Sequence, residues 1–182
     1  MKRLAVMLMF ASVCVGGEPA APLPGASIYQ LDAALTNQDG RTHGLGVYRG
    51  HPVLITMFYA SCPAVCPLII DTLRATEKEL TPAQRADLRV LLISIDPERD
   101  SVAALRTLAD QRHIDTSRWS LARAESAEVR TIAALLNVQY RQLPNGDFNH
   151  STVITLLSPQ GEIETTSTRL GTPDPQLVSQ LR

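Results

Sequence analysis

Residues 51–80 read HPVLITMFYASCPAVCPLIIDTLRATEKEL, an apolar run that passes through two cysteines into a stretch of mixed character. The apolar, β-branched run from His51 to Ala60 predicts a strand that is buried on both faces. From Pro63 to Leu80 apolar residues recur at helical spacing with charges between them, which predicts an amphipathic helix. A buried strand that leads directly into a helix is typical of an α/β sheet.

The chain then repeats this order of strand and helix. Residues 88–96 (LRVLLISID) predict a second buried strand, residues 99–114 a second amphipathic helix, and residues 126–138 a third helix with Ser126 as its N-cap. A right-handed crossover would make the two buried strands parallel neighbours in one sheet.

Turn residues predict antiparallel strands near both ends of the chain. Asp39-Gly40 predicts a hairpin within residues 37–45, and Pro159-Gln160-Gly161 predicts a closing hairpin within residues 151–167. A short helix is expected over residues 174–182. The sequence therefore predicts a single α/β domain over residues 22–182, with a central mixed sheet flanked by helices, an N-terminal hairpin and a closing hairpin.

Residues 1–21 have the layout of a signal peptide that is cleaved after export. Two basic residues precede an apolar run from Leu4 to Val15, and small residues and prolines follow. This run fits the ~7–15 residues of a signal peptide and falls short of the ~20 that span a bilayer. We therefore expect a periplasmic protein with no permanent membrane span. A lipid anchor at Cys14 is less favoured, because Val13 is bulky for the position before a lipidated cysteine.

The charge balance argues against partners that are bound through a strong electrostatic field. The chain has 17 Lys and Arg against 18 Asp and Glu, and it has no local basic cluster. Nucleic acid and anionic lipid both favour a basic surface. We expect no nucleic-acid partner, and instead a protein or a small ion.

Cys62 and Cys66 are the two cysteines that remain once residues 1–21 are removed. They fall at the start of the predicted helix, where unpaired N–H groups and the helix dipole stabilise thiolates, so both sulfurs can be deprotonated near neutral pH. Residues four apart on a helix can bond to each other or share a soft metal ion. A structural disulfide across so short a loop would add little stability. A redox-active dithiol/disulfide and a metal site remain as the main alternatives.

The four histidines differ in their sequence context. His43, His51 and His113 are expected at surface or capping positions, whereas His150 ends a turn-rich loop directly before a strand. A loop histidine is by itself more often exposed than ligating, but this loop could carry the imidazole toward the first helix. Two thiolates suit Cu(I), and an added imidazole gives a three-coordinate site that can also hold Cu(II). Zinc would usually need a fourth protein ligand.

Three segments together resemble the Sco/SenC family of copper-binding assembly proteins for cytochrome c oxidase. They are FYASCPAVCP (58–67), LLISIDPERDSVAAL (91–105) and FNHSTVITLLSPQGEI (148–163). The resemblance implies a thioredoxin-like fold and copper held by Cys62, Cys66 and His150. It also implies delivery of copper to, or reduction of the cysteines of, the dinuclear copper centre in the copper-bearing subunit of the oxidase. A periplasmic copper donor or thiol reductant is expected as a further partner.

Acidic residues occur both near His150 and in the DPERD segment. Members of the family often carry Asp where this chain has Asn149, and Asp147 is a nearby candidate for the role of that carboxylate. In the DPERD segment we interpret Asp96 as the end of a strand and Asp100 as a cap of the second helix, with no ligand role for either.

Other functions remain open for the cysteine pair. A thiol-disulfide oxidoreductase would need only the dithiol, although the usual motif of such enzymes has two intervening residues and this one has three. A thiol peroxidase would need a Thr or Ser hydroxyl and an Arg beside one activated cysteine, and no such sequence framework accompanies Cys62. An inert disulfide would neither exchange with thiols nor give way to copper.

Overall fold

The computed structural model describes residues 21–62 and 65–182. The predicted signal peptide, apart from Ala21, lies outside these residues, and so does Pro63, the first residue of the predicted helix. Within the described ranges, no helix is both long enough and apolar enough to cross a bilayer.

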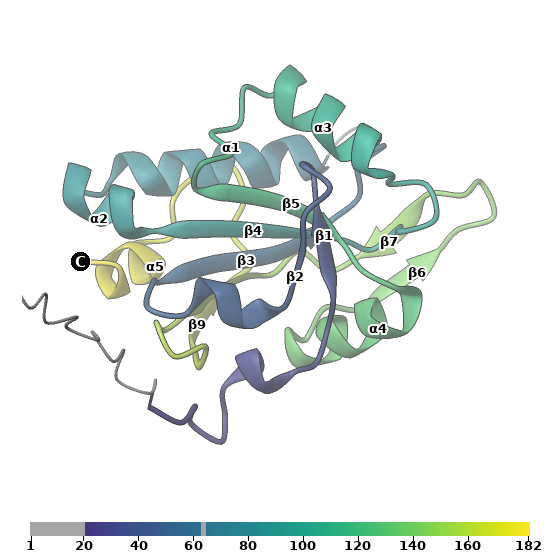
Figure 1. Cartoon of the computed structure of the whole chain (residues 1–182). Helices are drawn as coiled ribbons and strands as arrows, with labels where there is room; N and C mark the ends of the chain where they lie inside the picture. Colours follow the sequence, from purple (N-terminus) through teal and green to yellow (C-terminus); the bar gives the residue numbers. More distant parts are fainter. Residues whose placement is uncertain (1–20, 63–64) are drawn as a thin grey trace, which may run out of the picture.

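The core of the molecule is a seven-stranded mixed sheet with the strand order β2-β1-β5-β4-β3-β8-β9 (Figure 1). Its strands are β1 (Leu35–Asn37), β2 (Thr42–His43), β3 (Val53–Phe58), β4 (Arg89–Ser94), β5 (Trp119–Arg123), β8 (Ile154–Leu157) and β9 (Ile163–Ser167). β3, β4 and β5 run parallel, while β1 with β2 and β8 with β9 add antiparallel pairs at the two edges. The predicted mixed sheet, its parallel central strands and both hairpins are confirmed.

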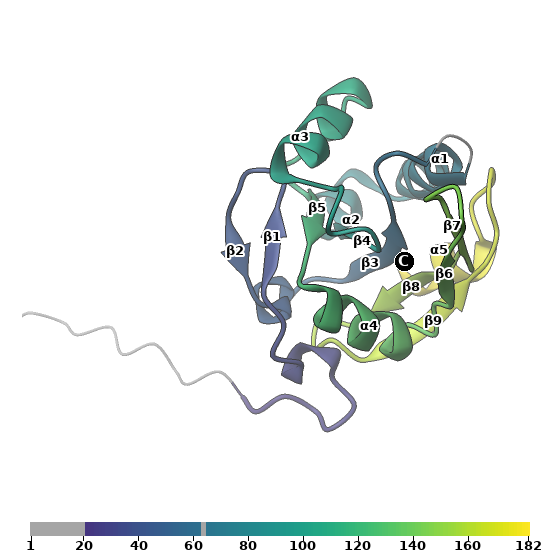
Figure 2. The same ribbon diagram turned by 90° about the vertical axis from the view of Figure 1, so that its right-hand side faces the viewer.

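Helices cover both faces of this sheet. They are α1 (Val65–Lys78), α2 (Pro82–Asp87), α3 (Val102–Gln111), α4 (Ser126–Leu135) and α5 (Pro175–Gln180). Two short 3-10 helices, η1 (Ile28–Gln30) and η2 (Leu45–Tyr48), precede them in the chain. Figure 2 shows α1 and α3 on one face and α4 on the other. Because both faces are covered, every residue of β3 is buried, as its unbroken apolar sequence predicts.

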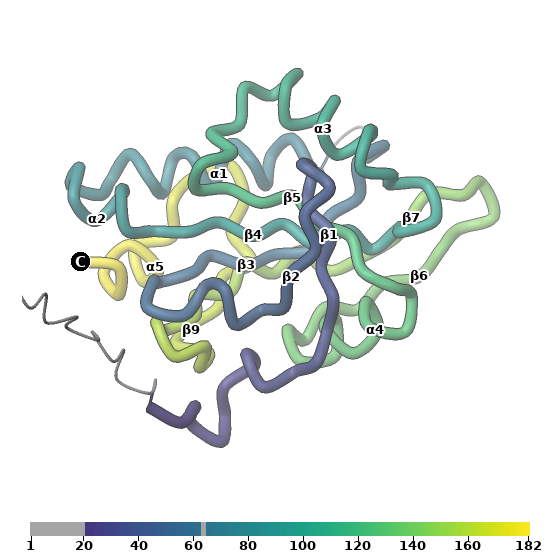
Figure 3. The backbone as a smooth tube through the Cα atoms, in the orientation of Figure 1, coloured from purple at the N-terminus to yellow at the C-terminus, as the bar shows by residue number. Residues whose placement is uncertain are grey.

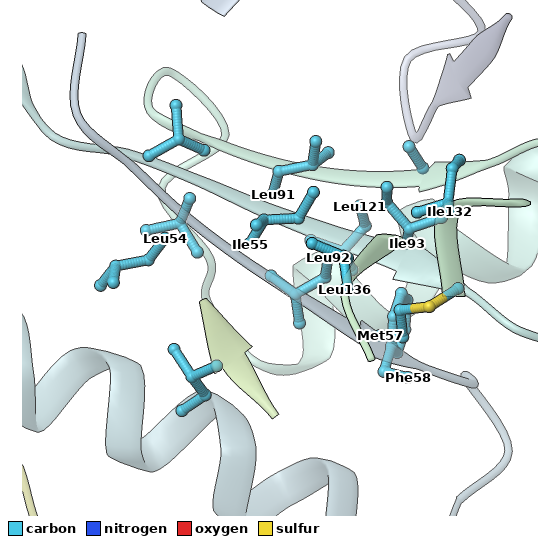
Figure 4. Close-up of a cluster of buried hydrophobic side chains, with 14 of the residues drawn as sticks. Leu54, Ile55, Met57, Phe58, Leu91, Leu92, Ile93, Leu121, Ile132 and Leu136 are labelled. Atoms are coloured by element: carbon cyan, nitrogen blue, oxygen red, sulfur yellow. The ribbon is translucent and has the colours of Figure 1, made fainter. Parts of the chain in front are cut away.

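Apolar side chains from the central strands and from α4 pack together in the interior. Ile55 of β3 lies opposite Leu91 of β4 in the parallel register, and Figure 4 shows both in a buried cluster that also includes Leu54, Met57 and, from α4, Ile132. Each of these side chains is at most 1% exposed. Full burial of such a side chain contributes about 1.5–3 kcal/mol. The carboxyl ends of β3 and β4 therefore extend from a rigid base.

The starts of two helices differ from the prediction. Ser101, and not Asp100, caps α3, because its Oγ accepts a hydrogen bond from the N–H of Ala104 at 3.2 Å. The N-cap of α4 is Glu125, whose N–H donates to the Glu128 carboxylate at 3.0 Å, so Ser126 is the first helical residue. In both cases a side chain other than that of the predicted cap accepts a hydrogen bond from a backbone N–H at the start of the helix.

Two of the elements that were not predicted are β5 and α2. β5 has only five residues, and Ser120 and Arg123 interrupt its apolar character, yet it pairs with β4 in the middle of the sheet. α2 buries none of its residues, so it has no apolar periodicity to detect. A capping box at Thr81 and Gln84 and the proline at its start hold it instead.

The segment that leads to His150 is a hairpin and not the loop that the sequence predicted. β6 (Tyr140–Gln142) and β7 (Phe148–His150) pair antiparallel and form a separate two-stranded sheet. Its turn is closed by the N–H of Leu143, which donates to the carbonyl of Asp147 at 2.7 Å, and it needs the positive φ of +84° at Gly146. Figures 1 and 3 show this hairpin projecting from the body at the end of the sheet where β3 and β4 finish.

Candidate functional site

The turn that carries Cys62 follows β3 directly and is held from below by Asp100. The N–H of Cys62 donates to the carbonyl of Tyr59 at 3.2 Å. Asp100, 2% exposed, accepts from the N–H of Ala60 at 2.9 Å and from Ser94 Oγ at 2.5 Å. Burial raises the pKa of the Asp100 carboxyl, while these two hydrogen bonds act in the opposite direction. This side chain therefore joins the start of the cysteine turn to the end of β4.

Cys66 lies in the first turn of α1, next to Cys62. Its N–H donates to Cys62 Sγ at 3.4 Å, and both residues are thiols in this structure. Cys66 is only 4% exposed, whereas Cys62 is half-buried. Burial raises the pKa of the Cys66 thiol well above its ordinary value. The prediction that both sulfurs can be deprotonated near neutral pH is therefore wrong for Cys66, because the helix terminus does not offset the loss of hydration.

An aromatic cluster brings the histidine hairpin to the cysteine turn. Tyr59, at the end of β3, has its ring centroid 5.5 Å from that of Phe148 and 6.0 Å from that of His150. Phe148 and His150 are two residues apart on β7, so their side chains share one face of the hairpin. Tyr59 thus fixes which face of β7 is directed at the site.

Cys62 and His150 line the same pocket, which has a volume of about 280 Å³. The other lining residues come from the cysteine turn, from α1 and from the hairpin: Tyr59, Val65, Leu143, Asp147, Phe148 and Asn149. The structure thereby places two of the three predicted ligands at one hollow, and the hydrogen bond between Cys66 and Cys62 places the third beside it.

These residues are neighbours without yet forming a coordination shell. Within residues 21–62 and 65–182, no group of three His, Cys, Asp or Glu side chains lies close enough together to hold a metal ion. A metal shared by Cys62, Cys66 and His150 would therefore require a change of rotamer or a movement of the hairpin toward α1.

The imidazole of His150 is oriented by the backbone. Its Nδ1 lies 3.1 Å from the carbonyl oxygen of Ser151. A carbonyl can only accept a hydrogen bond, so Nδ1 carries the proton and Nε2 keeps its lone pair. Burial lowers the pKa of His150, which favours the neutral ring. A neutral imidazole with one nitrogen tied to a carbonyl is the usual form of a histidine ligand.

The carboxylate proposed as a substitute near His150 is engaged elsewhere. Asp147 lines the pocket, but its Oδ2 accepts from Asn145 Nδ2 at 2.8 Å within the hairpin turn. The partner that the structure gives to the imidazole of His150 is instead the backbone carbonyl of Ser151.

The remaining histidines lie where the sequence predicts, at surface or helix-end positions. His51 Nδ1 is 2.6 Å from Asp87 Oδ1, and the His43 ring packs edge-on against Tyr48. His113 follows the end of α3 with a φ of +50°. None of these three lines the pocket of Cys62.

A family model described as SCO1/SenC matches residues 24–182, which is nearly all of the described chain. This chain belongs to the SCO1/SenC family. It is 24% identical over 162 residues to the SCO1 protein homolog of Bacillus subtilis (strain 168), covering 87% of this chain and 81% of that protein. It is 29% identical over 147 residues to the mitochondrial SCO2 homolog of Bos taurus. That match covers 75% of this chain and spans about half, 52%, of the bovine protein.

Solved structures share the fold of this SCO1/SenC chain. Yeast Sco1 with copper bound superimposes with a TM-score of 0.69 at 22% identity, covering 82% of this chain and 83% of that one. A structure of BsSco, a member of the Sco family in which a disulfide switch is described, superimposes with a TM-score of 0.67 at 20% identity. This match covers 88% of this chain and 96% of that one. At such identities the likeness concerns the fold, and it confirms the predicted thioredoxin-like α/β architecture.

Sequence reasoning missed three residues that shape the site of this family member. Tyr59 and Phe148 form the aromatic contact between the cysteine turn and the β6–β7 hairpin. Arg99 donates a hydrogen bond to the carbonyl of Gly146 in the hairpin turn. The alternation of Phe148 and His150 around Asn149 was a signal for the shared face of β7. Arg99 lies in the DPERD segment, which had been interpreted as a strand end and a helix start.

Proposed function

We propose that this chain is a periplasmic copper-binding protein of cytochrome c oxidase assembly. It delivers copper to the dinuclear copper centre of the oxidase, or reduces the cysteines of that centre. The observation that carries the proposal is that Cys62 and His150 line one pocket while the N–H of Cys66 donates to Cys62 Sγ. Membership of the SCO1/SenC family and the copper-bound yeast relative support it.

The donor set fits copper by its chemistry. Two sulfurs and one imidazole nitrogen suit Cu(I), and the imidazole extends the site to Cu(II). Cys62, Cys66 and His150 are the residues that would hold the ion. The Ser151 carbonyl keeps the proton of the imidazole on Nδ1 and so leaves Nε2 available to the metal.

The placement of the donors suits a metal that is passed on. Cys62 and His150 lie at an open pocket, whereas Cys66 is almost fully buried. A partner's thiols could therefore approach from the side of Cys62 and His150 and replace those ligands one at a time. The copper ion is then the cargo of the protein and not a fixed part of it.

Anaerobic Cu(I) titration of the reduced protein tests copper binding. We expect one tightly bound Cu(I) per chain, as measured by competition with a chromophoric chelator. The Cys62→Ala/Cys66→Ala double variant and the disulfide-oxidised protein should lose this binding, since both lack the thiol pair. Equal binding by the double variant would contradict the proposal.

A second candidate function is thiol-disulfide reduction, favoured by the unequal exposure of the two cysteines. Cys62 is accessible and Cys66 is buried. The Cys62 thiolate would attack a partner disulfide and form a mixed disulfide, which releases one partner thiolate. Cys66, on losing its proton, would then attack Cys62 Sγ, which releases the second partner thiolate and leaves the Cys62–Cys66 disulfide. The partner gains two electrons, and an external thiol reductant would restore the dithiol.

Reduction of a disulfide substrate by the metal-free protein distinguishes the two functions. If reduction dominates, turnover with a small thiol reductant needs both cysteines and is unchanged in His150→Ala, because His150 has no part in the exchange. If copper delivery dominates, turnover is slow and His150→Ala instead alters metal binding.

A further inference from the structure

The hairpin that carries His150 has few ties to the rest of the protein. Its two strands pair with each other and not with any of the seven described strands of the main sheet. Its base is closed by the N–H of Ser151, which donates to the carbonyl of Gln139 at 2.8 Å, and by the N–H of Gln139, which donates to Ser151 Oγ at 2.9 Å. A short two-stranded hairpin is marginally stable by itself, so its outer part depends on contacts with the body.

Arg99 supplies such contacts from the loop between β4 and α3. Its Nε donates to the Asp96 carboxylate, and its Nη2 donates to the carbonyl of Gly146 in the hairpin turn. Its guanidinium carbon also lies 5.9 Å from the centroid of the Phe148 ring, over the face of that ring. One side chain thus holds both the turn and the second strand of the hairpin.

The anchor of Arg99 is itself fixed. Asp96 is 4% exposed, and its N–H donates to Ser94 Oγ at 2.9 Å. Its carbonyl accepts from the N–H of Asp100 at 2.9 Å, which closes the loop into a tight turn. The Asp96 carboxylate is therefore a stationary point against which the guanidinium can hold the hairpin.

The same loop also holds the cysteine side of the site. Asp100 accepts from the N–H of Ala60 in the turn before Cys62, while Arg99 bonds to the hairpin of His150. We propose that Arg99 is a positioning residue that braces the β6–β7 hairpin and so keeps His150 at the pocket of Cys62, within reach of the copper site. This inference rests on the copper-binding function proposed above and assigns Arg99 no contact with the metal.

The shape of the guanidinium explains why arginine serves here. Its planar fork donates to a carboxylate and to a carbonyl in different directions while its face lies on a ring. A lysine ammonium is a compact charge that can keep one of these contacts without the others. Arg99→Lys should therefore have an intermediate effect, and Arg99→Leu should remove the brace.

The first test uses the metal-free, reduced protein, so it does not depend on copper. Hydrogen exchange followed by mass spectrometry should show faster exchange in the peptide covering residues 143–150 of Arg99→Leu, with no change in α4. Arg106→Leu is the matched control, because Arg106 pairs with Asp39 on another edge of the molecule and is exposed to the same degree, 44% against 43% for Arg99. Unchanged exchange over residues 143–150 in Arg99→Leu would overturn the proposal.

The second test measures Cu(II) affinity in a double-mutant cycle of Arg99→Leu and His150→Ala. We expect Arg99→Leu to weaken binding about tenfold when His150 is present, as is usual for residues that orient a metal ligand. In the His150→Ala background it should have little effect, because there is no imidazole left to position. Equal losses in both backgrounds, or tighter binding in Arg99→Leu, would contradict the positioning role.

The two proposals fail in different ways in this cycle. If His150→Ala alone leaves copper affinity unchanged, the three-residue copper site fails, whatever Arg99 does. If His150→Ala weakens binding and Arg99→Leu does not, the copper site stands and the brace fails.

Discussion

The N–H of Cys66 donates to the sulfur of Cys62 across 3.4 Å, so the first turn of α1 is directed at one sulfur of the pair. A donor from a helix N-terminus stabilises negative charge on the sulfur that accepts it. The side chain of Cys66 is instead 4% exposed, and burial raises the pKa of its thiol. The two cysteines are therefore chemically different, although the sequence presents them alike.

The first prediction concerns alkylation of the reduced protein. Limiting iodoacetamide at pH 7.5 should modify Cys62 well before Cys66, because Cys62 is accessible and Cys66 is buried as a thiol. Peptide mapping by mass spectrometry measures the ratio. In denaturant both cysteines should react at similar rates, and equal rates in the native protein would contradict the asymmetry.

The second prediction concerns a partly buried ion pair in the last turn of α1. Glu77 accepts from Arg118 Nη1 at 2.5 Å and from Trp119 Nε1 at 3.1 Å. Glu77→Ala should lower the free energy of unfolding by about 2 kcal/mol, because it leaves the buried indole N–H of Trp119 without this acceptor, whereas the partly exposed Arg118 still pairs with Asp115. Urea unfolding measures the loss, and Glu77→Gln, which keeps an acceptor oxygen, should lose less.

Glu77 also provides a control for the copper site, because it does not line the pocket of Cys62. At temperatures where Glu77→Ala is folded, its copper stoichiometry should equal that of the original protein. A lost copper site in the folded variant would mean that the site depends on the whole of α1 and not on its first turn.

The third prediction concerns stability at alkaline pH. Burial of the Tyr48 hydroxyl raises the pKa of this side chain to about 12. In the unfolded chain tyrosine ionises near pH ~10. Between these values the unfolded state loses a proton that the folded state keeps, so stability is full below pH ~10 and falls as pH rises toward 12.

The comparison of Tyr48→Phe with the original protein isolates this effect. The free energy of unfolding of the original protein should fall by about 1 kcal/mol more than that of the variant between pH 9 and pH 11. Other groups that titrate in this range are common to both proteins. Parallel falls would show that Tyr48 ionises equally in the folded and unfolded states.

The central elements of the fold were predictable because their residues have one dominant environment. β3 is buried along its whole length and α1 along one face, so burial alone fixes the hydrophobic pattern of each. β5 was missed because a charged residue, Arg123, ends this short strand. Arg123 is accommodated there because its Nη2 donates to the carbonyl of Pro97 at 2.7 Å. A tertiary hydrogen bond of this kind allows a charged residue in a strand, and the sequence carries no sign of it.

The candidate site could be proposed from the sequence as a set of residues but not as a geometry. The chemistry of Cys62, Cys66 and His150 follows from their side chains, and the resemblance to the Sco/SenC family implies that the cysteines act with a histidine far along the chain. The difference between the two cysteines depends on burial, and the position of His150 depends on Tyr59 and Arg99. Such contacts join segments that are distant in sequence, so no local pattern records them.

The most direct test of the copper site is the spectrum of the Cu(II)-loaded, reduced protein beside His150→Ala and His113→Ala. We predict one Cu(II) per chain, with a thiolate-to-copper charge-transfer band and nitrogen hyperfine coupling in the electron paramagnetic resonance spectrum. The coupling should disappear in His150→Ala and persist in His113→Ala, since His113 lies beyond the end of α3. An unchanged spectrum in His150→Ala would show that His150 is not a ligand and would contradict the site.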